Sequence, residues 1–426
     1  MLHSSCAADE ALVALSSWLV GAGASLSPKL HIRCELDRRG IFVRPHASLE
    51  VGEVAASVPL SLLLTVDRAL AHPAASSVSG TNLIALFLLD QLSEGAFYQP
   101  YVASLPGNVS TTITWSAAHL AELQASDLRP HAAKRNEAVE RQRQGLPLPV
   151  IPDAASWGWA LSMVWSRSHT VSLPRSGRQG ALAPLVDMFN HALQPNLGAA
   201  STEVERADGI AALVVRASQP LGSNEEATVP YGGSGPLSSA RLLMDYGFCV
   251  EEDVHDDVAL PLPLPRPADP RAQVLRRLRL LPPDTPPPRL QGGGAPLPLE
   301  AVVYARIATV DPPEEAHAEA MAAMTDLEDF ARHASGLPQV RRFLHAACQA
   351  RLHEYATSVS EDTALLEAAK ATSDGAARER LRCAIVVRRS EKRILESWIR
   401  TLAEPEVAAA PSVAAPVAGA RMRMEL

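Results

Sequence analysis

Residues 182–191 read LAPLVDMFNH, and this stretch decides the fold because an apolar, strand-forming run ends there on polar residues. The last two, Asn190 and His191, offer donors and acceptors that the end of a buried strand does not need for folding alone. Further along, Tyr231 and Tyr246 are each followed at once by glycine. A phenol beside glycine indicates a hydroxyl held against a closely approaching backbone, either at a ligand or at a chain crossing.

Other stretches complete a pattern of motifs in a fixed order. They are WSRSH at 165–169, EEATVPYG at 225–232, DYGF at 245–248, TSVSED at 357–362 and RRSEK at 388–392. Together with residues 182–191, they resemble the motifs of the SET-domain protein methyltransferases. The likeness is to the group that contains the Rubisco large-subunit and fructose-bisphosphate aldolase lysine methyltransferases and the actin-histidine methyltransferase. Each motif is weak by itself, but the set in this order is specific.

The resemblance implies an α+β fold, in which a SET domain of small β-sheets with a knot-like crossing carries a helical insert and precedes an all-α substrate-docking domain. On this chain the SET domain would span residues 1–257, with the insert at 67–165. A Pro/Gly-rich linker at 258–298, unable to hold regular ladders, would lead to a helical substrate-binding domain at 299–402. The Ala/Pro-rich residues 403–426 are expected to form a disordered tail.

The resemblance also implies S-adenosylmethionine as cofactor and a set of site residues. Tyr231 would be the catalytic phenol. The cofactor would be held by a hairpin turn, by an arginine whose fork suits a carboxylate, and by the two separate motifs: Asp37, Arg38, Arg39, Arg167, Asp187, Asn190, His191, Tyr246, Gly247 and Phe248. His169 stands where the family has an aromatic residue beside the substrate channel, which leaves the identity of the target side chain open.

Several of these stretches also have simpler interpretations. Residues 37–39 could be only a charged hairpin turn, and Arg167 only a helix-end arginine in solvent. Residues 251–257 are predicted to be a solvated acidic loop, because consecutive carboxylates do not converge on a cation without a turn motif, and no metal site is predicted. The basic residues at 388–393 are explained by a solvated helix face at least as well as by a partner site.

Composition sets the remaining bounds. With 426 residues, of which 47% are hydrophobic and 20% charged, the chain is long enough for two or three domains with apolar cores. A net charge of −8 argues against a general nucleic-acid binder, and no apolar run is long enough to predict a membrane span. Five scattered cysteines without CxxC spacing predict reduced thiols in an intracellular protein, without distinguishing chloroplast, cytoplasm and nucleus. The lack of the Cys-rich zinc clusters that flank many histone-directed SET domains favours a non-histone target.

Methyl transfer from a sulfonium is an in-line displacement that needs a neutral nucleophile aligned with the methyl carbon. A lysine amine with a pKa near 10.4 is neutral in only about one molecule in 2,500 at pH 7, so an apolar channel and the adjacent sulfonium must favour its neutral form. The leading hypothesis is an S-adenosylmethionine-dependent protein-lysine N-methyltransferase that acts on a non-histone protein. His169 keeps a histidine target open, and a non-catalytic SET-like binding module is the alternative from another class. The expected partner is a protein substrate, with no nucleic acid and no membrane, and the chain is expected to be a monomer.

Overall fold

The computed structural model describes residues 9–35, 38–107, 110–149, 151–173, 176–204, 211–232, 235–282, 285–292, 294–369 and 375–403. The predicted cofactor residue Asp37 and residues 404–426 of the predicted tail lie outside these ranges. The chain divides into two compact units, each with an apolar core of its own. Unit 1 comprises the described residues within 1–115, 132–237 and 241–248, and unit 2 those within 116–131, 238–240 and 249–426.

Unit 1 begins with a helix and a hairpin. Helix α1 (Glu10–Gly21) is capped by Asp9, whose carboxylate accepts a hydrogen bond from the backbone N–H of Leu12 at 3.1 Å. The hairpin consists of β2 (Leu30–Glu35) and β3 (Arg38–Val43), which pair antiparallel over their full length. The hairpin expected at this point of the sequence is therefore present.

Short strands form the sheets of unit 1. The other strands are β1 (Ser25–Leu26), β4 (Val54–Pro59), β5 (Leu64–Thr65), β6 (Ser168–Leu173), β7 (Gly177–Leu182), β8 (Asn190–His191), β9 (Ser201–Val204), β10 (Ala211–Arg216) and β11 (Thr228–Val229). Antiparallel pairing gives a sheet in the order β1-β4-β10-β9 and another in the order β5-β7-β6. Strands β8 and β11 instead pair in parallel, and this pair joins the two sequence-distant motifs.

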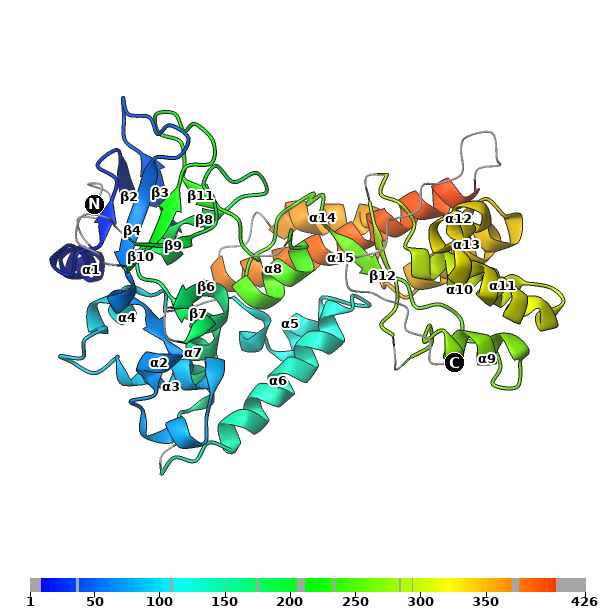
Figure 1. The fold of residues 1–426 in the computed structure, drawn as a ribbon, viewed down its shortest axis with the longest axis horizontal. Helices are drawn as coiled ribbons and strands as arrows, with labels where there is room; N and C mark the ends of the chain where they lie inside the picture. The colour runs from blue at the N-terminus through cyan, green and yellow to red at the C-terminus, as the bar shows by residue number, and fades with distance from the viewer. Residues whose placement is uncertain are drawn as a thin grey trace. The chain divides into compact units, whose positions relative to one another are not determined.

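The segment between β5 and β6 is mainly helical. Its helices in unit 1 include α2 (Val66–Ala69), α3 (Gly80–Asp90), α4 (Gln99–Ser104) and α7 (Ala154–Arg167). Helices α2, α3 and α7 lie together beside β6 and β7 (Figure 1). Because α7 runs directly into β6, the residues at this junction enter the site from a rigid element.

Three helices lie in, or begin in, the short segments of unit 2 that interrupt unit 1 in the sequence. Helix α5 (Ala117–Ala121) belongs to unit 2, while α6 (Leu128–Gln144) and α8 (Ser239–Tyr246) each begin in unit 2 and end in unit 1. The last residue of α8 is one of the predicted cofactor residues, so the position of Tyr246 is fixed by a helix end.

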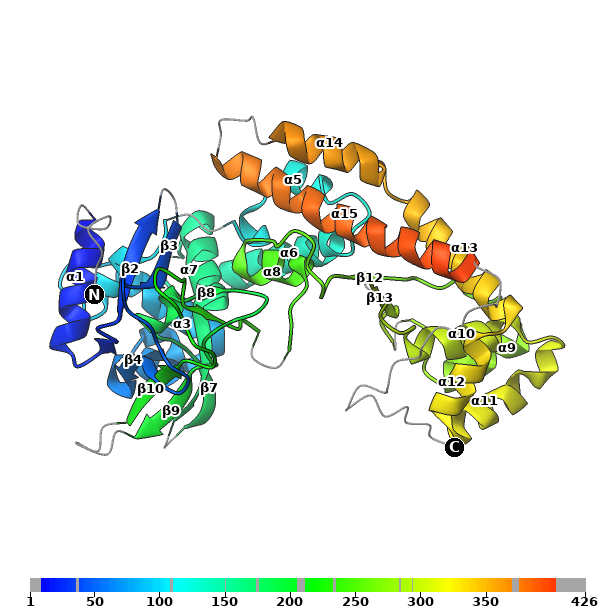
Figure 2. The ribbon, with the colours of Figure 1, turned by 90° about the horizontal axis from the view of Figure 1, so that it is seen from above.

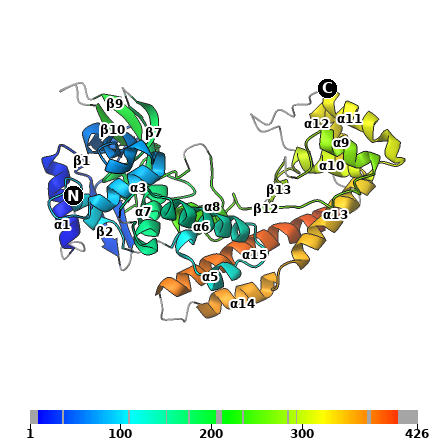
Figure 3. The ribbon, with the colours of Figure 1, turned by 90° about the horizontal axis from the view of Figure 1, so that it is seen from below.

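Unit 2 is helical apart from one small ladder. Its further elements are α9 (Pro270–Arg277), α10 (Leu299–Thr309), α11 (Ala316–Thr325), α12 (Leu327–Ser335), α13 (Pro338–His353), α14 (Val359–Ala369), α15 (Gly375–Ala403), β12 (Asp257–Ala259) and β13 (Arg289–Gln291). Helix α14 runs alongside the long helix α15 (Figures 2 and 3). A capping box starts α14: the backbone N–H of Ser358 donates to Glu361 at 2.7 Å, and the N–H of Glu361 donates to the Ser358 hydroxyl at 3.2 Å.

The expectation that residues 258–298 hold no ladder is wrong. Strands β12 and β13 pair antiparallel from Asp257↔Gln291 to Ala259↔Arg289, and α9 lies between them in sequence. The prolines of this segment lie outside the three-residue ladder, so none of its backbone donors is lost. An ion pair between Arg289 and Asp257 at 2.7 Å adds to the pairing.

The expectations for the charged stretches also need correction. Arg388 and Lys392 do not lie on a solvated face: they are 1% and 0% exposed and both pair with Asp362. In the acidic loop Asp253 and Asp256 are each only 5% exposed. Periodicity alone could not show this, because burial of these charges depends on partners that are distant in sequence.

The cysteines differ in state. Cys249, Cys348 and Cys383 are free and buried, as expected, whereas Cys34 is disulfide-bonded, so the expectation of reduced thiols throughout is wrong for Cys34. Within the described ranges, no helix has the length and apolar character to cross a membrane. In the same ranges, no three His, Cys, Asp or Glu side chains are grouped as a metal site would require.

Candidate active site

The two predicted motifs meet at the parallel pair of β8 and β11. Thr228 lies opposite Asn190 and Val229 opposite His191, so the strand that leads to Tyr231 runs beside the Asn-His corner. The backbone N–H of Tyr231 donates to Nδ1 of His191 at 3.2 Å. The segment that carries Tyr231 therefore contacts the Asn-His corner.

The phenol of Tyr231 is fixed at its outer end. Its hydroxyl donates to the backbone carbonyl of Phe189 at 3.0 Å, directly before the Asn-His pair. Burial raises the pKa of Tyr231 to about 12, so the phenol stays protonated at neutral pH. In this state it can donate one hydrogen bond and accept others, but it is not a phenolate base.

Aromatic rings surround the phenol. Tyr246 stacks on Tyr231 with ring centroids 4.8 Å apart, and Phe248 lies 6.3 Å from Tyr231 in an edge-on arrangement. The ring of His191 lies 5.2 Å from that of Tyr231 and 6.2 Å from that of Phe248. Such a cluster supplies an aromatic wall beside the phenol.

Gly247 allows this cluster to form. It has φ +82°, and a Cβ placed on it would approach the backbone N of Thr111 to 2.7 Å and the backbone C of Ser110 to 2.8 Å. No side chain fits in that space without moving the backbone. The close approach expected of a Tyr-Gly pair is thus confirmed at Tyr246-Gly247, where the neighbour is another chain segment.

A buried polar network lies beside the phenol. The side chain of Asp187 is 1% exposed and pairs with Arg167. Nη1 of Arg167 lies 3.3 Å from the Asp187 carboxylate and donates to the Asp187 backbone carbonyl at 3.0 Å. The hydroxyl of Tyr101 donates to the same carboxylate at 2.8 Å. Arg167 is thus held by Asp187 rather than free in solvent, contrary to the simpler interpretation.

The electrostatics of this network favour a charged arginine and a neutral histidine. Burial would lower the pKa of Arg167, but Asp187 and the nearby tyrosines outweigh it and raise this pKa. Burial lowers the pKa of His169, so its imidazole is neutral at pH 7. Burial, and then the Asp187 carboxylate, raise the pKa of Tyr101 well above its usual range.

Asn190 uses its side chain for the fold. Its amide donates to the backbone carbonyl of Arg39 at 2.8 Å and to Glu226 at 2.7 Å, and this ties β8 to the hairpin strand β3. A Cβ on Gly40 would approach Glu226 to 2.5 Å and the Asn190 amide to 3.0 Å, so the crossing is tight. The donors of the Asn190 amide are therefore used within the fold, which leaves its Oδ1 and its backbone for a cofactor.

A cavity of about 450 Å³ opens in unit 1 at these residues. Of the predicted site residues, Arg167, His169, Asp187, Tyr231 and Tyr246 line it. The others lie around it: His191 and Phe248 contact Tyr231, Asn190 and Arg39 hold the hairpin, and Gly247 packs on residues 110–111. For Arg38 the structure describes only the backbone, at the start of β3.

Among the residues not foreseen from the sequence are two that hold predicted site residues in place. Tyr101 lies on α4, 86 residues before its partner Asp187, and Glu226 lies 36 residues after its partner Asn190. The only local signal was the pair of glutamates before Thr228, which fits the family motif but gives no role for either one.

The chain is similar to known methyltransferases over most of its length. A family model described as the Rubisco LSMT substrate-binding domain matches residues 265–395. A solved structure of the LSMT SET domain bound to methyl-lysine and AdoHcy superimposes with a TM-score of 0.71, covering 92% of this chain and 91% of the other at 19% identity. The SET-domain fold predicted from the motifs is confirmed.

Sequence comparison agrees with this fold. The SET-fold chain is 24% identical to the actin-histidine N-methyltransferase of Xenopus tropicalis over 87% of its own length and 66% of that protein. It is 22% identical to the chloroplastic Rubisco large-subunit N-methyltransferase of Nicotiana tabacum over 58% of its own length and 52% of that protein. The chain therefore spans at most about two thirds of these relatives, and the resemblance to their group is confirmed.

Proposed function

We propose that this chain transfers a methyl group from S-adenosylmethionine to a side-chain nitrogen of a protein, with lysine as the leading target. The observation that carries the proposal is the Tyr231 phenol, protonated and fixed on the Phe189 carbonyl at the edge of a cavity of about 450 Å³. Because its O–H is used by Phe189, its oxygen can accept a hydrogen bond from an N–H of the target. This contact would align the nitrogen lone pair for displacement.

The residues present fit the proposed cofactor. Arg39 is partly buried, which lowers its pKa, and it lies close enough to Arg167 and Asp187 for their charges to act on it. Two guanidinium groups near the single carboxylate of Asp187 suit the carboxylate of an amino-acid moiety. Arg39 and Arg167 would hold that carboxylate, and the backbone of Asn190 and His191 would hold the polar groups beside it. When bound, the cofactor supplies the electrophilic methyl; structures of LSMT bound to AdoMet show that this fold accepts it.

Replacement of Tyr231 by Phe tests the assignment. We expect Tyr231→Phe to lower the rate of methyl transfer by about a hundredfold or more, because alignment and hydrogen bonding of the nucleophile are lost. The measurement is transfer of labelled methyl from S-adenosylmethionine to proteins of a cell lysate. Tyr304→Phe is the matched control, since Tyr304 also donates to a backbone carbonyl, that of Pro263 at 2.8 Å, in unit 2.

Two outcomes would contradict this proposal. If calorimetry detects S-adenosylmethionine binding but no lysate protein is labelled, the chain is a non-catalytic SET-like binding module. If the Tyr231→Phe variant transfers labelled methyl to lysate proteins as fast as the wild type, another group aligns the nucleophile.

A histidine target is the second candidate, because relatives named actin-histidine N-methyltransferase match this chain and His169 lines the cavity in place of an aromatic residue. The two targets differ in protonation. A lysine has to lose its proton, so its rate should rise about tenfold per unit between pH 7 and 9, whereas a histidine is already neutral and should give a flat profile. Mass spectrometry of the labelled protein then assigns the methylated residue.

We propose further that the substrate is a non-histone protein, that the chain works inside the cell and that it is a monomer. The match to a substrate-binding family model supports a protein partner. Light scattering on the purified protein tests the monomer, and proteomics of cells lacking the protein tests the target by the loss of a single methylated residue.

A further inference from the structure

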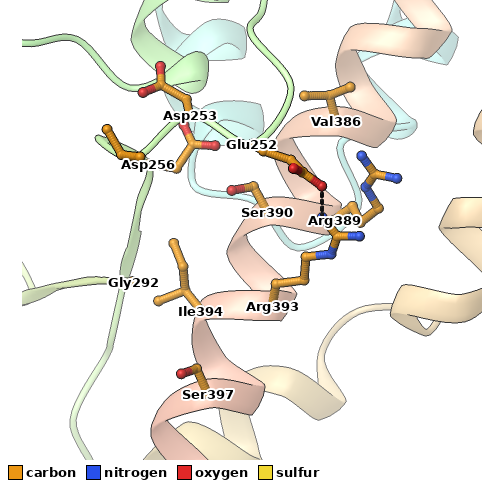
Figure 4. A pocket seen from close by; sticks show the side chains of 11 residues that line it. Glu252, Asp253, Asp256, Gly292, Val386, Arg389, Ser390, Arg393, Ile394 and Ser397 are labelled. Carbon is orange, nitrogen blue, oxygen red and sulfur yellow. Dashed lines mark hydrogen bonds and ion pairs between the residues drawn. The ribbon is translucent and has the colours of Figure 1, made fainter. Parts of the chain in front are cut away.

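A second cavity, of about 410 Å³, lies entirely within unit 2 (Figure 4). One wall is a face of α15, and the other is the acidic loop around residues 252–256. None of its lining residues lines the Tyr231 cavity. The two cavities therefore have no lining residue in common.

Two buried carboxylates line this cavity. Asp253 and Asp256 are each 5% exposed, and Oδ2 of Asp253 has no hydrogen-bond partner among the described residues. Their Oδ1 atoms are used: Oδ1 of Asp256 accepts from the N–H of Ser239 at 2.7 Å, and Oδ1 of Asp253 accepts from the N–H of His255 at 2.9 Å. Burial raises the pKa of Asp256 to about 6 and outweighs a hydrogen bond from the Ser390 hydroxyl, which lowers this pKa. The Asp256 carboxylate is therefore mostly ionised at pH 7. A buried oxygen without a partner is costly, which indicates that a donor binds there.

The arginines of the cavity are paired with other carboxylates. Arg393 pairs with Glu252 at 3.1 Å, as the dashed line in Figure 4 marks, and Arg389 pairs with Glu251 at 3.4 Å. With these cations neutralised, the charge left over in the cavity is that of the two aspartates. A cation from outside the unit would neutralise this charge and donate to the free oxygen.

The shape of the lining restricts which cation fits. Val254, Val386 and Ile394 add apolar surface beside the carboxylates, which suits a cationic head on an aliphatic stem. A metal ion is not favoured, since within the described ranges no three ligand side chains are grouped to hold one. Lysine and arginine side chains combine the required head and stem.

We infer that this cavity binds a lysine or arginine side chain of the protein substrate, at a docking position other than the methylated residue. That the partner is the substrate rests on the proposed function. It is also supported by the sequence of α15, much of which falls within the residues matched by the substrate-binding family model. The binding chemistry rests only on Asp253, Asp256 and the apolar wall.

Small amines test the binding chemistry without any methyl transfer. We expect n-butylamine and n-propylguanidinium, titrated into the full chain and followed by NMR, to bind saturably, whereas the neutral n-butanol does not. Asp256→Asn should weaken this binding at least about tenfold, the loss of one charge-assisted hydrogen bond. Ser397→Arg, which brings an internal guanidinium into the cavity from α15, should do the same without changing the loop.

Glu300→Gln is the matched control, because Glu300 is an exposed carboxylate on α10 of the same unit that does not line the cavity. Its amine binding should equal that of the wild type. Equal binding by Ser397→Arg and the wild type, or no saturable binding by the wild type, would overturn the inference. Because two variants alter opposite walls, misfolding of Asp256→Asn alone does not decide the result.

The docking role has its own readout once a labelled lysate protein is available. Asp256→Asn and Ser397→Arg should raise KM for that protein at unchanged kcat, because the cavity shares no residue with the Tyr231 site. Amine binding without any methyl transfer would contradict the proposed function but still support the cation site. Methyl transfer with unchanged KM in both variants would remove the docking role.

Discussion

Tyr101 adds a hydrogen bond to the buried ion pair of the candidate active site. Its hydroxyl donates to Asp187 at 2.8 Å, and its side chain is 1% exposed. Without it, the Asp187 carboxylate would keep the ion pair with Arg167 at 3.3 Å but lose its shorter hydrogen bond. A buried carboxylate that loses a donor is destabilised by its desolvation.

We therefore expect Tyr101→Phe to lower the free energy of unfolding by about 1–3 kcal/mol and to weaken S-adenosylmethionine binding, because Arg167 is less well fixed. Thermal unfolding and calorimetry measure the two effects. Tyr98→Phe is the control: Tyr98 is as buried, but donates to the backbone carbonyl of Leu63 at 3.1 Å, so it should affect stability alone. Wild-type cofactor affinity in Tyr101→Phe would disprove a positioning role.

The motif residues could be predicted because each motif is local and combines several residues in a fixed order. Tyr231, Asn190 and His191 were found in this way, and the structure brings them together. Tyr101 was missed because its role exists only through a partner 86 residues away. The side chain of Asn190 also had a use that the motif did not reveal, since it holds the hairpin through Arg39 and Glu226.

At the scale of elements, the turn after α8 shows why a glycine is required at one position. Gly247 has φ +82° and lies against the backbone of residues 110–111, whereas Gly177 has φ +70° and a Cβ placed on it would meet nothing within 4 Å. The two positions therefore share the left-handed backbone conformation and differ in the space available for a side chain. Comparing them separates strain from steric clash.

We expect Gly177→Ala to cost about 1 kcal/mol of stability through the left-handed backbone alone. Gly247→Ala should cost clearly more, and it should also weaken methyl transfer, because residues 110–111 or the Tyr246–Phe248 segment must move. Denaturant unfolding and the labelled-methyl assay measure these effects. Equal destabilisation by the two changes would mean that the close approach at Gly247 is not important.

Elements defined by local pattern were predicted better than their environment. The hairpin β2–β3 was expected from a short stretch of sequence, and α14 begins at a capping box, which is also a local signal. The burial of α15 could not be predicted in this way. Arg388 pairs with Glu122, 266 residues earlier, so its surroundings depend on the tertiary fold.

At the scale of the whole molecule, each unit is stabilised by its own core, and unit 2 adds a buried cluster of charges. Asp362 is 0% exposed and pairs with Arg388 at 2.8 Å and Lys392 at 2.5 Å. Burial alone would raise the pKa of Asp362, but the hydrogen bonds from Arg388 and Lys392 hold it below its usual value. A lowered pKa in the folded state adds stability above the unfolded pKa, near 4, and this is lost as the pH falls through the folded value.

Because the two units have separate cores, we expect calorimetry to resolve two unfolding transitions, and Asp362→Asn to lower only that of unit 2. The loss at pH 7 should be about 3–5 kcal/mol, since two buried cations are left without their shared carboxylate. It should shrink as the pH falls below 4 and through the lowered folded pKa of Asp362, where the wild-type carboxylate becomes protonated. Asp329→Asn, which breaks an exposed pair with Arg332, should change stability by less than about 1 kcal/mol. A shift of both transitions by Asp362→Asn would show that the units unfold as one.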